Sequence, residues 1–274
     1  MVSTPRSRLL VASVVVLLLT ALVPAGVGAD HEWGYHWKRT SLANPVVLGL
    51  GDNVTPNWDG FLFAAESDWD ASLVLSLSVV NGTVNPKSCR PKSGRIEVCN
   101  ASYGNNGWLG LARIWVSGVH ITAGSTQVND FYFDGGFGYG SDDWRQYVIC
   151  QEVGHVFGLS HTDENTANTN DGSCMDYTDN PSGGGGEPAN TSPNQHDFDE
   201  LEAIYNHVDS SGGGGRFGGA GGAGVIRFNV DPQGPPDFVG QDDWGDLLRA
   251  NGRLLLYRLN LGNGNYVFTF VIRA

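Results

Sequence analysis

The residues best suited to chemistry fall within one short stretch, from Gln151 to His161. Gln151 and His155 are four residues apart, so on a helix their side chains project from the same face one turn apart, with Glu152 beside them. Gly158 follows three residues later, and glycine readily adopts the positive φ that a sharp turn needs. Such a turn would bring His161 back towards His155.

Two imidazoles and one further ligand on such a helix form a tripod for zinc and leave a fourth position open to water. Zinc lowers the pKa of that water, and Glu152 is placed to take its proton. The spacing therefore predicts a hydrolytic zinc site with His155 and His161 as ligands and Gln151 completing or adjoining the tripod.

The stretch resembles the zinc signature H-E-x-x-H-x-x-G-x-x-H of the metzincin metalloproteases. It matches the signature at Glu152, His155, Gly158 and His161, and it departs at the first ligand, where Gln151 stands in place of histidine. The resemblance implies a zinc-dependent peptidase. In it Glu152 is the general base, which then donates its proton to the leaving amine.

Two further segments carry the same resemblance. Residues 173–177 are similar to the family's methionine turn beneath the metal, with Met175 as the methionine. In the astacin and serralysin branches a tyrosine two residues later assists at the metal, and Tyr177 matches it. Residues 193–208 are similar to the closing helix of matrixin domains. Together these segments imply an α/β (α+β) metzincin-like fold over residues 44–208. It has a twisted mixed β-sheet, an active-site helix and a C-terminal helix.

Gln151 leaves three outcomes open, because an amide oxygen is a weaker zinc donor than imidazole. Zinc binds through Gln151 and both histidines with reduced affinity, or through the histidines with water or a nearby side chain, or not at all. The retention of Glu152 favours a working variant site. We interpret His120, His196 and His207 as ordinary polar residues, although His196 begins a helix near the site.

The ligand stretch needs regular elements to position it. Apolar spacings of three and four predict helices over 56–72, 142–157 and 193–208. Ser141 or Asp142 would cap the second helix and Gly158 would end it. Short apolar or alternating runs predict strands over 45–50, 73–80, 95–100, 109–121 and 127–133, and a hairpin formed by 254–261 and 265–272.

The chain divides into four parts by composition. Arg6 and Arg8 precede an uncharged apolar run of 15 residues, and small residues follow at Ala29. This is the layout of a secretory signal peptide over 1–29, because the run is shorter than the ~20 residues that span a bilayer. We expect the metzincin-like domain at 30–210, starting with a polar arm at 30–44, then a glycine-rich linker at 211–224 and a small C-terminal β-element at 225–274.

An even number of cysteines in an exported chain indicates two disulfides. The four cysteines allow three pairings. We favour Cys89–Cys99 and Cys150–Cys174, because each pair closes a short local loop.

The charge balance limits the partners. The chain has 16 Lys+Arg against 29 Asp+Glu, and cleavage after Ala29 changes the net charge from −13 to −15 by removing two arginines. Nucleic acid and anionic membrane surfaces repel such a protein. The acidic and amide side chains of 163–171 could bind calcium through their oxygens, but they lack the ordered EF-hand spacing, which favours a solvated loop.

These observations predict a secreted, monomeric zinc metalloendopeptidase that acts on peptide or protein substrates. His155, His161 and Gln151 hold the metal, Glu152 is the base, and Tyr177 stabilises the oxyanion. The alternative is a catalytically impaired metzincin-like pseudo-protease that uses the same cleft as a secreted peptide- or protein-binding module.

Overall fold

The computed structural model describes residues 31–209 and 244–274. The expected signal peptide and the expected linker at 211–224 lie outside these residues.

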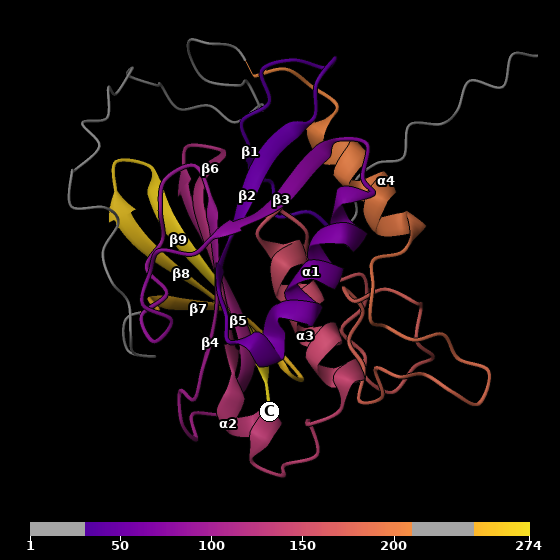
Figure 1. Ribbon diagram of the computed structural model, residues 1–274. Helices are drawn as coiled ribbons and strands as arrows, with labels where there is room; N and C mark the ends of the chain where they lie inside the picture. Colours follow the sequence, from indigo (N-terminus) through magenta and orange to yellow (C-terminus); the bar gives the residue numbers. More distant parts are fainter. Residues whose placement is uncertain (1–30, 210–243) are drawn as a thin grey trace, which may run out of the picture.

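One mixed sheet forms the centre of the molecule (Figure 1). Its strand order is β3-β2-β4-β6-β5-β9-β8-β7, and β1 pairs with β6. Neighbours from β3 to β6 are parallel, and all pairs from β6 to β7 are antiparallel. The strands are β1 (His36–Trp37), β2 (Val46–Asn53), β3 (Leu75–Asn81), β4 (Ile96–Ala101), β5 (Trp108–Ser117), β6 (His120–Asn129), β7 (Asp246–Asn251), β8 (Leu254–Gly262) and β9 (Asn265–Arg273).

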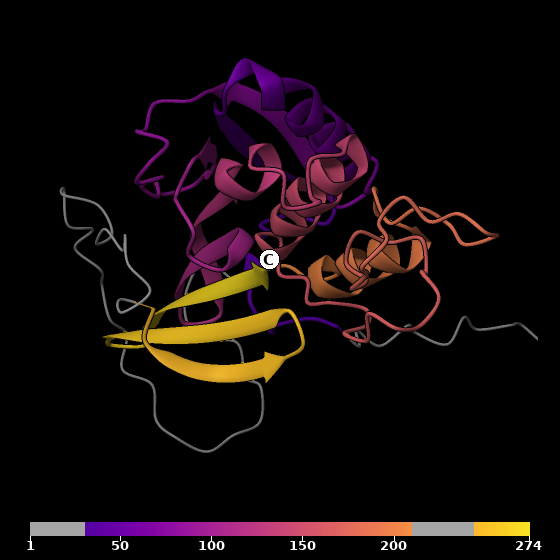
Figure 2. The ribbon, with the colours of Figure 1, turned by 90° about the horizontal axis from the view of Figure 1, so that it is seen from below.

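Two helices, α1 (Pro56–Asp70) and α3 (Asp142–His155), lie side by side on one face of this sheet (Figures 1 and 2). Proline opens α1 because its fixed φ suits the first helical position. The Ser141 hydroxyl accepts a hydrogen bond from the Trp144 N–H at 3.3 Å and caps α3, as the sequence predicts. The α/β class, with a mixed sheet and a helix carrying the ligand stretch, is therefore confirmed.

The helix α4 (Gln195–Tyr205) begins with a capping box. The Asn194 side chain accepts from the backbone of the first turn, and the Asp197 carboxylate accepts the Asn194 N–H at 2.7 Å. Its buried face carries Leu201 and Ile204, and it ends in the fully buried Tyr205.

Two strand predictions are wrong in detail. Residues 127–133 were expected to be one strand, but β6 ends at Asn129 and α2 (Asp130–Asp134) follows. The Asn129 side chain accepts the Phe131 N–H at 3.3 Å, and this local bond starts the helix. Residues 109–121 form two strands, β5 and the start of β6, because the chain turns at Gly118, whose φ is +63°.

The described part of the range expected as a small C-terminal element, residues 244–274, forms β7, β8 and β9, which continue the main sheet (Figure 2). β8 and β9 pair as the predicted hairpin, and β9 pairs with β5 from Trp108 to Ser117. Leu254, Phe268 and Phe270 belong to the same hydrophobic core as α1 and α3. These strands therefore share both the sheet and the core of the preceding chain.

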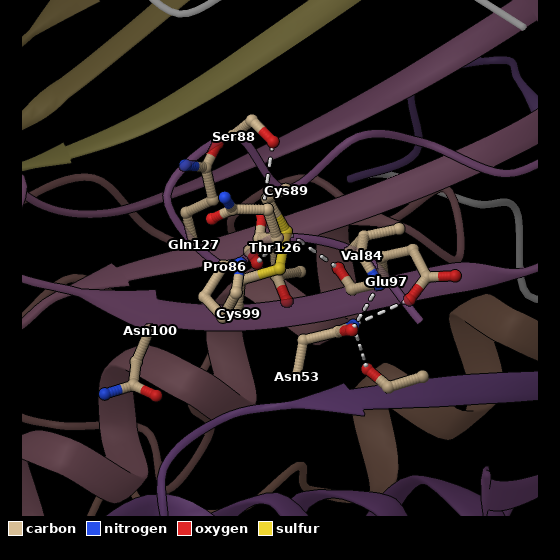
Figure 3. The surroundings of a disulfide bond; sticks show 12 residues. Asn53, Val84, Pro86, Ser88, Cys89, Glu97, Cys99, Asn100, Thr126 and Gln127 are labelled. Atoms are coloured by element: carbon tan, nitrogen blue, oxygen red, sulfur yellow. Dashed lines mark hydrogen bonds between the residues drawn. A yellow bond between two sulfur atoms is a disulfide. The ribbon is translucent and has the colours of Figure 1, made fainter. Parts of the chain in front are cut away.

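Both expected disulfides are present. Cys89–Cys99 ties the loop before β4 to β4 itself, and Figure 3 shows it beside Thr126 of the neighbouring strand β6. In the same view Asn53 of β2 donates a hydrogen bond at 2.6 Å to the buried Glu97 of β4. Cys150–Cys174 links α3 to the segment that carries Met175.

Candidate metal centre

The ligand helix ends in a turn that only glycine allows. α3 ends at His155, and Gly158 has a φ of +103°. A Cβ at this position would also lie 2.4 Å from the Tyr35 carbonyl oxygen. Beyond the turn the chain returns beside the N-terminal arm, where the Trp33 N–H donates to the Gly158 carbonyl at 3.1 Å.

The turn brings three of the predicted site residues together. The rings of His155 and His161 lie 4.5 Å apart between centroids and nearly perpendicular, at 85°. The Tyr177 ring is 4.4 Å from that of His161. All three side chains are buried. The His155 Nδ1–H donates to the Leu159 carbonyl at 2.9 Å, which leaves Nε2 of the neutral ring with its lone pair, as a metal ligand requires.

Gln151 lies one turn before His155 on α3 and is fully buried. Its amide nitrogen donates to the Cys174 carbonyl at 3.0 Å and to the Tyr147 hydroxyl at 3.3 Å. These bonds fix the orientation of the side-chain amide and leave the oxygen Oε1 as the atom that it offers to a ligand.

Met175 packs directly under the ligand helix. A Cβ on Gly154 of α3 would lie 2.5 Å from the Met175 sulfur, so the helix approaches the methionine as closely as glycine permits. The Ser173 hydroxyl donates to Asp197 of α4 at 2.6 Å and accepts the Met175 N–H at 2.8 Å. The Cys150–Cys174 disulfide links the same two segments covalently.

Several buried polar atoms at this place have no hydrogen-bond partner among residues 31–209 and 244–274. They are Gln151 Oε1, both carboxylate oxygens of Glu152, both ring nitrogens of His161 and the Tyr177 hydroxyl. Buried polar groups are almost always paired, because leaving one unpaired costs about 1–3 kcal/mol. Imidazole nitrogen and amide oxygen are donors that zinc accepts, so the chemistry of His155, His161 and Gln151 fits the zinc that the sequence predicts.

Burial also sets the ionisation of the site. It raises the pKa of Glu152 well above the ordinary value and lowers that of His155 to about 4. Burial, with the neighbouring His155, lowers the pKa of His161 well below its usual range. Both imidazoles are thus neutral and ready to bind metal. A bound cation would in turn favour the ionised form of Glu152.

The C-terminal strand β9 covers one side of the site. The Phe270 ring stacks on that of His155, with centroids 4.6 Å apart and planes 12° apart. A cavity of about 570 Å³ adjoins the site, and its lining includes His161, His31, Glu164 and Arg249. Arg249 of β7 is 3.0 Å from Glu164, so the C-terminal strands also contact the rim of this cavity.

His196, which begins a helix near the site, is grouped with His31 and Glu200, and His31 lines the same cavity as His161. Its ligand atom lies within 4.8 Å of those of His31 and Glu200, and its ring is 4.9 Å from that of His31.

The segment 163–171, considered for calcium, does not gather as a metal-ligand group in the part of the chain that the structure describes. The carboxylate of Asp163 instead accepts the Asn165 N–H at 2.6 Å within a local turn. Calcium binding at this segment is unsupported.

Two features of the structure have no signal in the sequence. The sequence predicts Phe270 only as part of a hairpin strand. Its contact with His155 depends on the pairing of β9 with β5. His120 and His207 were interpreted as ordinary polar residues, but they meet His36 and Asp209 in one cluster. These four residues are spread over 174 positions, so no local pattern could have revealed the cluster.

Comparisons with known proteins give distant likenesses only. No protein-family model matches the chain, and no curated protein matches its sequence. Among solved structures, the chain is similar to high choriolytic enzyme 1, a hatching-enzyme zinc protease of the medaka fish Oryzias latipes. The identity is 14%, the match covers 62% of this chain and 94% of that one, and the TM-score is 0.33. Myroilysin matches at 12% identity over 65% and 98% of the two chains, with a TM-score of 0.35.

None of the helices in the described residues is long and apolar enough to cross a membrane.

Proposed function

We propose that this chain is a secreted zinc metalloendopeptidase whose metal is held by His155, His161 and the Gln151 oxygen. One observation carries the proposal. The buried polar atoms without hydrogen-bond partners among the described residues include Gln151 Oε1, both Glu152 oxygens and both ring nitrogens of His161, all on the helix and turn that bring His155 and His161 together. Two disulfides support an exported protein, because such bonds persist mainly in oxidising compartments.

Each residue has a distinct role in peptide hydrolysis. Zinc, when bound, lowers the pKa of a water and polarises the scissile carbonyl. Glu152 accepts the proton of the attacking water and passes it to the leaving amine. The Tyr177 hydroxyl, which lies beside His161, donates a hydrogen bond to the oxyanion that develops on the carbonyl oxygen.

A non-catalytic peptide- or protein-binding module is the second candidate. It is favoured by two observations: Phe270 of β9 stacks on His155, and Glu152 is only 1% exposed and packs against Gly110 of β5. In this conformation the base lies away from the cavity. Hydrolysis therefore requires that the covering strand or the neighbouring loops move when a substrate binds.

Glu152→Gln separates the two candidates. The variant should retain zinc, because this carboxylate is not a ligand, and should hydrolyse peptides about 10²–10⁴-fold more slowly, because the general base is lost. Peptide cleavage is followed by mass spectrometry of a peptide mixture, and zinc content by elemental analysis.

Glu202→Gln is the matched control, since Glu202 is exposed on α4. It should leave both zinc content and hydrolysis unchanged. A wild-type chain that binds zinc but cleaves no peptide would favour the binding module. Unchanged hydrolysis in Glu152→Gln would remove Glu152 from the mechanism.

A further inference from the structure

Three histidines converge on one carboxylate oxygen outside the candidate active site. The Asp209 Oδ1 lies 3.3 Å from Nε2 of His36, 3.0 Å from Nε2 of His120 and 3.3 Å from Nε2 of His207. The Nε2 atoms of His36 and His207 are 3.0 Å apart. The ligand atoms of His36, His120 and Asp209 all lie within 4.8 Å of one another.

Separate elements bring these side chains together. His36 on β1 pairs with His120, the first residue of β6, in the parallel register of the two strands. His207 and Asp209 follow the end of α4. Asp209 is held there by two backbone bonds, because its carboxylate accepts the Arg39 N–H at 2.7 Å and its own N–H donates to the Arg39 carbonyl at 2.7 Å.

Hydrogen bonding alone satisfies this cluster poorly. A carboxylate oxygen has two lone pairs and can therefore accept two good hydrogen bonds. Three imidazole nitrogens face the Asp209 Oδ1. The His36 and His207 nitrogens also face each other, and only one of them can donate in that contact. A cation among these atoms would take one lone pair from the carboxylate oxygen and one from each neutral imidazole that binds it.

The distances suit zinc. Zinc binds imidazole nitrogen at about 2.0–2.1 Å and carboxylate oxygen at about 2.0–2.2 Å, so its tetrahedral ligands lie roughly 3.3–3.5 Å from one another. Four of the separations in the cluster, 3.0 to 3.3 Å, are equal to this range or slightly shorter. Three imidazoles and a carboxylate are also a donor set that zinc accepts.

We propose that His36, His120 and Asp209 form a second zinc site, distinct from the candidate active site and structural in function. His207 lies outside this group of three, but its Nε2 is 3.3 Å from Asp209 Oδ1, so a shift of this half-exposed side chain would supply the fourth ligand that closes a structural zinc site. The ion would fasten the segment after α4 to the N-terminal arm and to the sheet. Since the His207 side chain is 44% exposed, the ion can enter from solvent.

The test isolates this site from the candidate active site. In full-length protein carrying His155→Ala and His161→Ala, zinc content is measured by elemental analysis and affinity by competition with a chelator. This background should retain one zinc per chain. Adding His120→Ala or Asp209→Asn should weaken zinc binding about tenfold or more. Asp246→Asn, the same change at an exposed position on β7, should have no effect.

A second variant tests the same site with less risk of disturbing the fold. His207→Gln alters a half-exposed side chain, and in the otherwise wild-type protein it should lower the zinc content by one equivalent. The proposal is overturned if the background holds no zinc, or if His120→Ala and His207→Gln leave zinc affinity unchanged. Because the background lacks both His155 and His161, this outcome does not depend on whether the proposed peptidase site binds metal.

Discussion

At position 151 an amide group occupies the place where the metzincin signature has an imidazole. The Gln151 nitrogen is held by the Cys174 carbonyl and the Tyr147 hydroxyl, so the side chain cannot turn freely to present another atom. Its oxygen is a neutral and comparatively weak zinc donor. The surrounding hydrogen bonds therefore offset part of that weakness by orienting the oxygen before the ion binds.

Gln151→His should strengthen zinc binding at the candidate active site, because imidazole is the better ligand. A chelator competition, performed in a chain that also carries His120→Ala to weaken the second site, measures the change. We expect the affinity to rise at least about tenfold.

His196→Ala is the companion variant. His196 groups with His31 and Glu200, so its removal should leave zinc affinity unchanged. If His196→Ala abolished binding while Gln151→His had no effect, the third ligand would be His196 and the assignment of Gln151 would be wrong.

The residues of the candidate active site were recognisable because they are close in sequence. Local periodicity places Gln151 and His155 on one face of the helix, and His161 follows one glycine turn later. The four residues of the second cluster are joined only by the pairing of β1 with β6 and by the course of the chain after α4. Such tertiary neighbours leave no periodic trace in the sequence.

Two elements build the candidate active site. α3 and the turn after it carry the predicted ligands, and the segment with Met175 packs against α3. The Cys150–Cys174 disulfide joins them across a sequence separation of 24 residues. Cys89–Cys99 closes a separation of 10 residues, ends on β4 and not on α3, and gives a natural comparison.

Replacing Cys150 and Cys174 together with alanine should lower the free energy of unfolding by about 3 kcal/mol, because the unfolded chain is no longer constrained. It should also weaken zinc binding, since the Cys174 carbonyl that orients Gln151 would lose its tether. Denaturant unfolding and chelator competition measure the two effects.

The double variant Cys89→Ala, Cys99→Ala should lose a similar free energy of unfolding, about 3 kcal/mol in the same entropic model, with zinc affinity unchanged. Equal zinc affinity in both double variants would show that the disulfide at the site contributes stability alone.

Element prediction succeeded where one local signal dominated. Ser141 and the apolar spacing after it specify α3, and its expected range differs from the observed one by two residues at the end. It failed where two signals competed. The run at 127–133 is rich in β-forming residues, but the side chain of Asn129 bonds to the following backbone and begins a helix instead. The two-residue strand β1 is too short to give any periodic pattern.

On the scale of the whole molecule, β9 connects α3 with the C-terminal strands. It pairs with β5 and β8 in the sheet, and its Phe270 contacts His155 at the end of α3. Phe270 is fully buried, stacks on His155 and meets Trp33 of the N-terminal arm at 4.9 Å. Its ring therefore lies among three segments that are far apart in sequence.

Phe270→Ala should lower the free energy of unfolding by about 3–5 kcal/mol, the usual cost of removing a buried phenylalanine. Phe137→Ala is the control, because Phe137 is 50% exposed, and it should cost well under that amount. Urea unfolding followed by tryptophan fluorescence measures both. A loss below about 1 kcal/mol in Phe270→Ala would mean that the C-terminal strands contribute little to the core.

The place of β9 between β5 and β8 also imposes an order of assembly on the growing chain. A ribosome completes β5 long before it reaches β9, so one edge of β5 has no sheet partner during most of synthesis. The turn at Gly262–Gly264 lets β8 and β9 form a hairpin quickly, but docking that hairpin on β5 closes a very long loop and is correspondingly slow. His155 reaches its final surroundings only in that last step. Until then the nascent chain carries a finished ligand helix beside an open, aggregation-prone strand edge.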